Sequence, residues 1–229
     1  MKRFLLALSL AMTLSTVSTV VCAQMSAEEA TALLDKGEAG DAKAIADLKE
    51  KSEHGDAKAQ FILGQMYDTG KGVQQSDVEA ANWYRKAAEE WYIKAQLNLG
   101  IMYEEGKGVK KDYAEAANWY RRAADQRNAW GEFAMGNMYE NGHGVPQDSA
   151  IAVDWYRKAA AQGLAAAQMA LGRMYMTGDG VPANYTEALR WVRLAKAQAN
   201  GGQGAPDNEL AGKTWFHKAT DWLQNVVHF

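Results

Sequence analysis

A unit of 36 residues recurs through most of the chain, and this period constrains the fold more than any other feature. One glycine, one tyrosine and one tryptophan return in each copy. The three columns are Gly64, Gly100, Gly136 and Gly172; Tyr67, Tyr103, Tyr139 and Tyr175; and Trp83, Trp119, Trp155 and Trp191. A fixed period between about 20 and 50 residues indicates a repeat architecture, in which each unit packs only on its neighbours.

The sequence of each unit predicts two helices joined by a glycine-containing loop. In the first helix, small and apolar residues recur at spacings of three and four, as an amphipathic helix requires. The glycine inside that helix costs about 1 kcal/mol of helix propensity, so its recurrence predicts that a partner helix approaches closely. A second helix begins at a strong N-cap residue in every copy, namely Ser76, Asp112, Asp148 and Asn184. We interpret the recurring tryptophan as core packing rather than as a ladder for stacking ligands.

The repeats divide the chain into an ordered series of segments. We expect a signal peptide at 1–23, capping helices of a degenerate repeat at 24–56, four repeats at 57–92, 93–128, 129–164 and 165–200, and a linker with a C-terminal capping helix at 201–229. Ser26 with Glu29 is a capping-box pattern that opens the first of these helices. The predicted fold class is therefore all-α, a solenoid of antiparallel helix pairs.

The first 23 residues have the pattern of a secretory signal. Lys2 and Arg3 precede an apolar run of about a dozen residues, which is shorter than the roughly 20 that span a bilayer. Small residues at Val21 and Ala23 predict cleavage after Ala23, and hence a periplasmic or secreted protein. An uncleaved membrane anchor is the alternative interpretation, and we expect no stable membrane insertion after cleavage.

Cys22, the only cysteine, raises the further alternative of a lipoprotein. The residues before it, Thr19, Val20 and Val21, match a lipid-attachment signal poorly. Cleavage after Ala23 would remove the thiol, so the processed chain would contain no disulfide.

Composition and motifs argue against several functional classes. The net charge of −3 lacks the basic excess that nucleic-acid binding usually requires, so we expect no nucleic-acid partner. No serine lies in a G-x-S-x-G pattern, and the histidines show no metal-ligand spacing. We find no nucleotide loop either. The sequence therefore predicts a protein without a cofactor, a metal site or a catalytic constellation.

The unit resembles the Sel1-like repeat, a relative of the tetratricopeptide repeat, over residues 57–200. In the second copy the resemblance rests on Ala95, Gln96, Leu99, Gly100, Met102, Tyr103, Gly106, Gly108, Asp112, Ala116, Trp119, Tyr120, Ala123 and Ala124. The resemblance implies a right-handed α/α superhelix used mainly as a scaffold for protein–protein contacts. Exported members act as envelope scaffolds, host-interaction factors or immunity proteins against secreted toxins, so the expected partner is another protein such as a toxin or an envelope enzyme.

A cell-wall or β-lactam-acting hydrolase is the alternative function that this resemblance suggests. It concerns a cysteine-rich branch of the family, in which the helix pairs are crosslinked. The processed chain would have no cysteine, which disfavours this alternative.

The irregular positions are the candidate binding residues. At two inter-repeat turns the chain has Trp91 and Arg127, where the equivalent turns have Gly55 and Gly163. The third copy has Gly131 and Glu132 at the positions of Ala95 and Gln96 in the second copy. Exposed Trp, Tyr and Arg often anchor interfaces, which singles out Trp91, Tyr92, Arg127 and Trp130. We hypothesise that Trp91 and Trp130 contribute to one interface; local packing against a neighbouring repeat is the alternative.

A second set of candidates consists of variable positions on the first helix of each repeat, which we expect to face an open groove. They are Lys58, Phe61, Ile62 and Gln65; Lys94, Leu97, Asn98 and Ile101; Trp130, Phe133, Ala134 and Asn137; and Ala166, Met169, Ala170 and Arg173. The apolar members could instead be partly buried. The selected binding candidates among them are Lys94, Asn98, Ile101, Trp130, Asn137 and Arg173.

Overall fold

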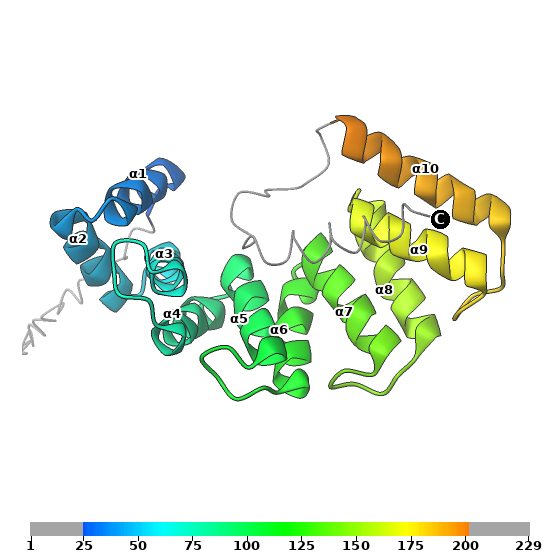
Figure 1. Cartoon of the computed structure of the whole chain (residues 1–229), viewed down its shortest axis with the longest axis horizontal. Coiled ribbons are helices and arrows are strands. Elements are labelled where there is room, and N and C mark those ends of the chain that lie inside the picture. Colours follow the sequence, from blue (N-terminus) through cyan, green and yellow to red (C-terminus); the bar gives the residue numbers. More distant parts are fainter. Residues whose placement is uncertain (1–24, 202–229) are drawn as a thin grey trace, which may run out of the picture.

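The computed structural model describes residues 25–201, with side chains up to residue 197, and that part of the chain is entirely α-helical. Its ten helices follow one another along a curved arc from α1 to α10 (Figure 1). Their bounds are α1 Ala27–Glu38, α2 Ala42–Glu53, α3 Ala57–Thr69, α4 Asp77–Glu89, α5 Ile93–Glu105, α6 Tyr113–Asp125, α7 Ala129–Asn141, α8 Ser149–Ala161, α9 Ala165–Thr177 and α10 Tyr185–Gly201. The predicted signal peptide and C-terminal capping helix lie outside the described residues.

Each helix packs mainly on the helix before it and the helix after it. Helices α3, α5, α7 and α9 are the first helices of the four repeats, and α4, α6, α8 and α10 are the second helices. The pair α1–α2 precedes them as the expected degenerate unit. This arrangement confirms the predicted all-α solenoid of helix pairs.

The predicted helix ends are present. The side chains of Asp112, Asp148 and Asn184 each accept hydrogen bonds from two backbone amides in the first turn of the next helix, and Ser76 and Ser26 each accept one. Each such cap contributes about 1 kcal/mol, because it satisfies amides that have no partner within the helix. The first loop glycine ends the first helix in a left-handed conformation in all four repeats, for example Gly106 at φ 76°.

The helix glycines confirm the expected close approach and identify the partner. A Cβ atom on Gly64 would lie 2.7 Å from the ring of Tyr84 on the second helix of the same repeat. Tyr120 covers Gly100 and Tyr156 covers Gly136 in the same way, and the three tyrosines are at most 1 % exposed. Glycine therefore provides the space into which the largest fully buried side chains pack.

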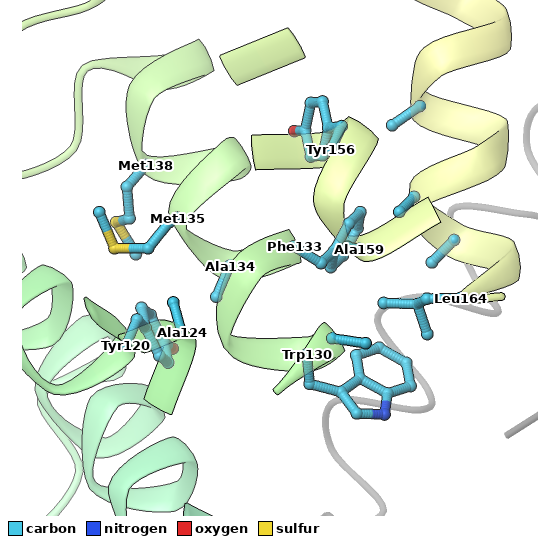
Figure 2. Packing of buried hydrophobic residues seen from close by; sticks show 14 of the residues in the cluster. Tyr120, Ala124, Trp130, Phe133, Ala134, Met135, Met138, Tyr156, Ala159 and Leu164 are labelled. Atoms are coloured by element: carbon cyan, nitrogen blue, oxygen red, sulfur yellow. The ribbon is translucent and has the colours of Figure 1, made fainter. Parts of the chain in front are cut away.

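The first helices are buried on more than one face. Around α7, Figure 2 shows Met135 and Met138 directed to one side, toward Tyr120, while Phe133 lies on the other side near Tyr156. Each first helix lies between the second helix of its own repeat and the second helix of the preceding unit, so solvent reaches little of its surface.

This packing overturns the predicted open groove at most variable positions. The apolar members and Asn98 are at most 8 % exposed: Phe61, Ile62, Leu97, Asn98, Ile101, Trp130, Phe133, Ala134, Ala166, Met169 and Ala170. Only Lys58, Gln65, Lys94, Asn137 and Arg173 are half-buried. The spacing of three and four identified a face correctly, but in a solenoid that face packs against a neighbour.

The tryptophan column is core only in part. Trp119 is buried, whereas Trp83, Trp155 and Trp191 are half-buried. The outer face of the ring is covered by a cation three residues later on the same helix, since Lys86 Nζ lies 3.8 Å from the centroid of Trp83 and Lys158 Nζ lies 3.7 Å from that of Trp155. Long cationic side chains commonly cover apolar surface in this way.

Candidate protein-binding surface

Four turns join one repeat to the next, and they all adopt the same left-handed backbone conformation. Gly55 and Gly163 have φ of 88° and 89°, while Trp91 and Arg127 have φ of 61° and 58°. Trp91 and Arg127 are the two residues other than glycine with positive φ in the described part of the chain. An L-residue in this region costs roughly 1–2 kcal/mol, because its Cβ crowds the backbone.

Trp91 directs its side chain to solvent. It is 60 % exposed, and it stands at the turn between α4 and α5. The next residue holds the turn in place: the ring of Tyr92 packs against that of Phe61 at a centroid distance of 5.1 Å. Tyr92 is therefore half-buried and has a structural role. Of these two aromatic residues, only Trp91 is exposed to solvent.

Trp130 is buried, so the hypothesis that it shares an exposed interface with Trp91 is wrong. It is 8 % exposed, it packs edge-on against Phe133 at 6.2 Å, and it belongs to the same core cluster as Leu164 (Figure 2). Local packing, which the sequence left open, is what the structure shows for Trp130. A partner would reach Trp91 without reaching Trp130, so the two do not form one exposed interface.

The other candidates have structural partners. Asn98 and Ile101 are buried among the neighbouring helices, at 7 % and 6 % exposed. Asn137 accepts a hydrogen bond from the Tyr156 hydroxyl at 2.5 Å.

Arg173 forms an ion pair with Glu140, which also accepts a hydrogen bond from Tyr156 at 2.7 Å. Burial, together with the charge of Glu140, raises the pKa of Tyr156 well above its usual value, so this hydroxyl stays protonated and donates. Lys94 is half-buried. Arg127 is exposed, on the turn that follows α6.

Sequence reasoning missed a row of carboxylates beside these turns. Glu53, Glu89 and Asp125 are the last residues of α2, α4 and α6, and all three are exposed. They occupy one column of the 36-residue repeat, and that recurrence of acidic residues was the signal available in the sequence. In the third repeat the column contains Ala161. We call Glu53, Glu89 and Asp125 the carboxylate row.

Glu132 is the one buried carboxylate in the column that elsewhere contains glutamine. Gln60, Gln96 and Gln168 each donate to a backbone carbonyl of the preceding helix, at 3.0–3.2 Å. Glu132 instead accepts from Gln162 at 2.7 Å. Burial raises its pKa, and this hydrogen bond and the nearby cations lower it only in part.

Within residues 25–201, no group of three or more His, Cys, Asp or Glu side chains is arranged to hold a metal ion. No helix in the same part of the chain is both long enough and apolar enough to cross a membrane.

The fold and the turns together define a helical-repeat solenoid protein whose repeats have a fixed loop signature. The sequence matches the Sel1 repeat family at residues 57–90, 93–128, 131–164, 165–200 and 192–221, so the chain belongs to this family. The first four matches coincide closely with the predicted repeats. The fifth overlaps α10 and extends into the segment where we predict a linker and a capping helix, mostly outside the described residues.

Two solved structures resemble the chain along most of its length. A Sel1 repeat protein from Oxalobacter formigenes is 31 % identical, with a TM-score of 0.71, and the match covers 85 % of this chain and 87 % of that one. A protein called c5321, described as a protective antigen of uropathogenic Escherichia coli strains, is 38 % identical, with a TM-score of 0.69 over 74 % of this chain. The match spans 38 % of that antigen's length. Comparison with curated protein sequences gives no match.

Proposed function

We propose that this protein is a non-enzymatic binding module of the bacterial envelope, and that it contacts its protein partner through the α4–α5 turn. Sel1 repeat proteins are in general interaction scaffolds, which supports the broad assignment. The single observation that supports this surface is the exposure of Trp91. Its side chain is 60 % exposed, and its backbone adopts the left-handed conformation, in which glycine would be less strained.

Folding alone gives no reason for a tryptophan at this position. Glycine adopts the left-handed conformation at no steric cost, and two of the four equivalent turns use it. An exposed indole adds unfavourable apolar hydration and little packing. Strain retained in this way is typical of functional sites, and tryptophan is among the residues most often found at the energetic centres of interfaces.

The envelope location rests on the signal-like pattern of residues 1–23. The description of the Escherichia coli relative as a protective antigen supports an exported location as well. Within the envelope, the module would act either as a scaffold or as a stoichiometric inhibitor, for example an immunity protein against a secreted toxin. Both roles need a binding surface and no catalytic group.

Affinity capture with matched variants tests the binding surface. The tagged full-length protein, a Trp91→Ala variant and a Tyr185→Ala control would be incubated with periplasmic extract, and bound proteins quantified by mass spectrometry. Tyr185 is 69 % exposed at the start of α10, so its replacement removes an equally accessible aromatic ring elsewhere. We expect a partner captured by the wild type and the control to be lost with Trp91→Ala. Equal capture by all three proteins would refute the assignment to this turn.

Cell fractionation with N-terminal sequencing tests export. We expect the protein in the periplasm or medium, with a chain that starts at Gln24. A chain that keeps residues 1–23 in the membrane fraction would show an uncleaved anchor instead. A lipid label that disappears in a Cys22→Ala variant would show a lipoprotein.

A further inference from the structure

We propose that the carboxylate row and Trp91 together bind a basic segment of the partner, one rich in arginine or lysine. This inference rests on the proposed function, because it assigns a chemical class of partner to the same edge of the solenoid. It is drawn from the charges and exposure of this edge, which the family resemblance does not specify.

The three residues of the carboxylate row occupy equivalent places in three consecutive units of the solenoid. Glu53, Glu89 and Asp125 each end the second helix of one of three consecutive units, directly before the turn to the next unit. Successive units pack side by side along the arc (Figure 1), so the three carboxylates follow the edge on which Trp91 lies. Glu90, also exposed, adds a fourth carboxylate next to Trp91.

These positions are unfavourable for an acidic residue in the isolated protein. The C-terminal end of a helix has a partial negative charge, and a carboxylate there costs roughly 0.3–1 kcal/mol. The side chains of Glu53, Glu89 and Asp125 form neither an ion pair nor a hydrogen bond with another described residue. The acidic column therefore does not stabilise the fold through such contacts.

Two of the nearby cations are held over aromatic rings. Lys86 and Arg122 lie over the rings of Trp83 and Trp119. Arg127 is exposed on the α6–α7 turn and is the nearest cation in sequence to Asp125. The negative ends of α2, α4 and α6 lie next to the positive N-terminal ends of α3, α5 and α7, so the negative character of this edge comes from the exposed carboxylates of Glu53, Glu89, Glu90 and Asp125 themselves.

A guanidinium or ammonium group fits this surface in two ways. It can stack on the exposed face of Trp91, where a cation–π contact contributes about 0.5–1 kcal/mol. It can also form charge-assisted hydrogen bonds to the carboxylates, for which the planar guanidinium has the better geometry. An acidic protein surface or a nucleic acid would be repelled by the same groups, so the arrangement favours a basic protein segment.

The experiment uses a defined probe, a fluorescein-labelled peptide of alternating arginine and glycine, with an aspartate–glycine peptide as its opposite. Anisotropy titrations on the full-length protein would be carried out at about 50 mM and about 200 mM sodium chloride. We expect the arginine peptide to bind more weakly at the higher salt concentration, and the aspartate peptide not to bind. The variant Glu53→Gln/Glu89→Gln/Asp125→Asn should weaken arginine-peptide binding by about tenfold, which corresponds to roughly 1.4 kcal/mol.

A matched variant separates the surface from net charge. Glu28→Gln/Glu79→Gln/Glu115→Gln removes the same three charges from exposed first-turn positions of α1, α4 and α6. We expect it to change binding by less than about twofold. Trp91→Ala should weaken binding in addition to the loss seen with the triple variant. Equal losses in the two triple variants, or no arginine-peptide binding at low salt, would overturn the proposal.

The outcome is distinguishable from a failure of the proposed function. If Trp91→Ala abolishes capture of a partner while the arginine peptide does not bind, the turn is a binding site for a partner that is not basic. If the peptide binds as expected but capture is unaffected by Trp91→Ala, the acidic surface exists and the assignment of the physiological partner to the turn is wrong.

Discussion

The ring of Tyr120 lies against Gly100 so closely that a methyl group at position 100 would overlap its edge. This contact joins the two helices of the second repeat. We predict that Gly100→Ala lowers the free energy of unfolding by about 1–3 kcal/mol through overpacking, although alanine has the higher helix propensity. Chemical denaturation monitored by circular dichroism would measure it. A variant as stable as the wild type would show that the ring moves aside at little cost.

The left-handed turns predict an unusual stabilising substitution. Trp91→Gly should raise the free energy of unfolding by about 1 kcal/mol, since it relieves the positive φ and removes a largely exposed side chain. The reverse change at an equivalent turn, Gly163→Ala, should lower it by a similar amount. Denaturation midpoints would measure both effects. A destabilised Trp91→Gly variant would indicate that the indole has a packing role.

The two irregular tryptophans should differ in their effect on stability. Trp130→Ala removes a buried ring beside Phe133 and should destabilise by about 3–5 kcal/mol. Trp91→Ala removes an exposed ring and should stay within about 0.5 kcal/mol of the wild type. Parallel thermal melts would compare them. Similar losses in both variants would contradict the different burial of these residues.

Glu132 predicts a pH-dependent stability difference. Its pKa is raised in the folded state, so folding binds its proton more strongly, and the ionised form is destabilising above that pKa. The substitution Glu132→Gln introduces glutamine, as at positions 60, 96 and 168 of the same column. The new amide can donate to a backbone carbonyl and still accept the hydrogen bond from Gln162. We expect a gain of about 1 kcal/mol at neutral pH.

That gain should shrink as the pH falls through the raised pKa toward the unfolded value of about 4.3, because wild-type Glu132 then becomes protonated and neutral. Denaturant titrations of both proteins between neutral and acidic pH would follow the difference. A constant difference across this range would mean that the pKa of Glu132 is the same in the folded and unfolded states.

The regular features were predictable because each depends on a local rule. Asp148 and Asn184 cap helices through their own side chains, and Gly106 ends a helix through its own backbone, so a single sequence position determines each feature. The recurrence of these positions every 36 residues was sufficient to predict the order of helix pairs. The close approach at the helix glycines was predicted for the same reason, although its partner Tyr120 was not.

Burial at variable positions could not be predicted, because it depends on several elements at once. Ile101 and Phe133 lie on a face whose spacing is the same whether that face meets solvent or a neighbouring helix. Trp91 and Trp130 likewise both replace the small or polar residues of other repeats, yet one is 60 % and the other 8 % exposed.

By itself, the sequence determined the class of fold, the order of the helix pairs and the left-handed helix ends at the loop glycines, because caps and glycines act within a few residues and recur with the repeat. Only the tertiary structure decided which irregular residues face solvent. Packing of each first helix between two second helices buries Trp130 and leaves Trp91 on the edge, beside the ends of helices whose last residues are acidic. Exposure is a property of neighbouring repeats, and no single repeat specifies it.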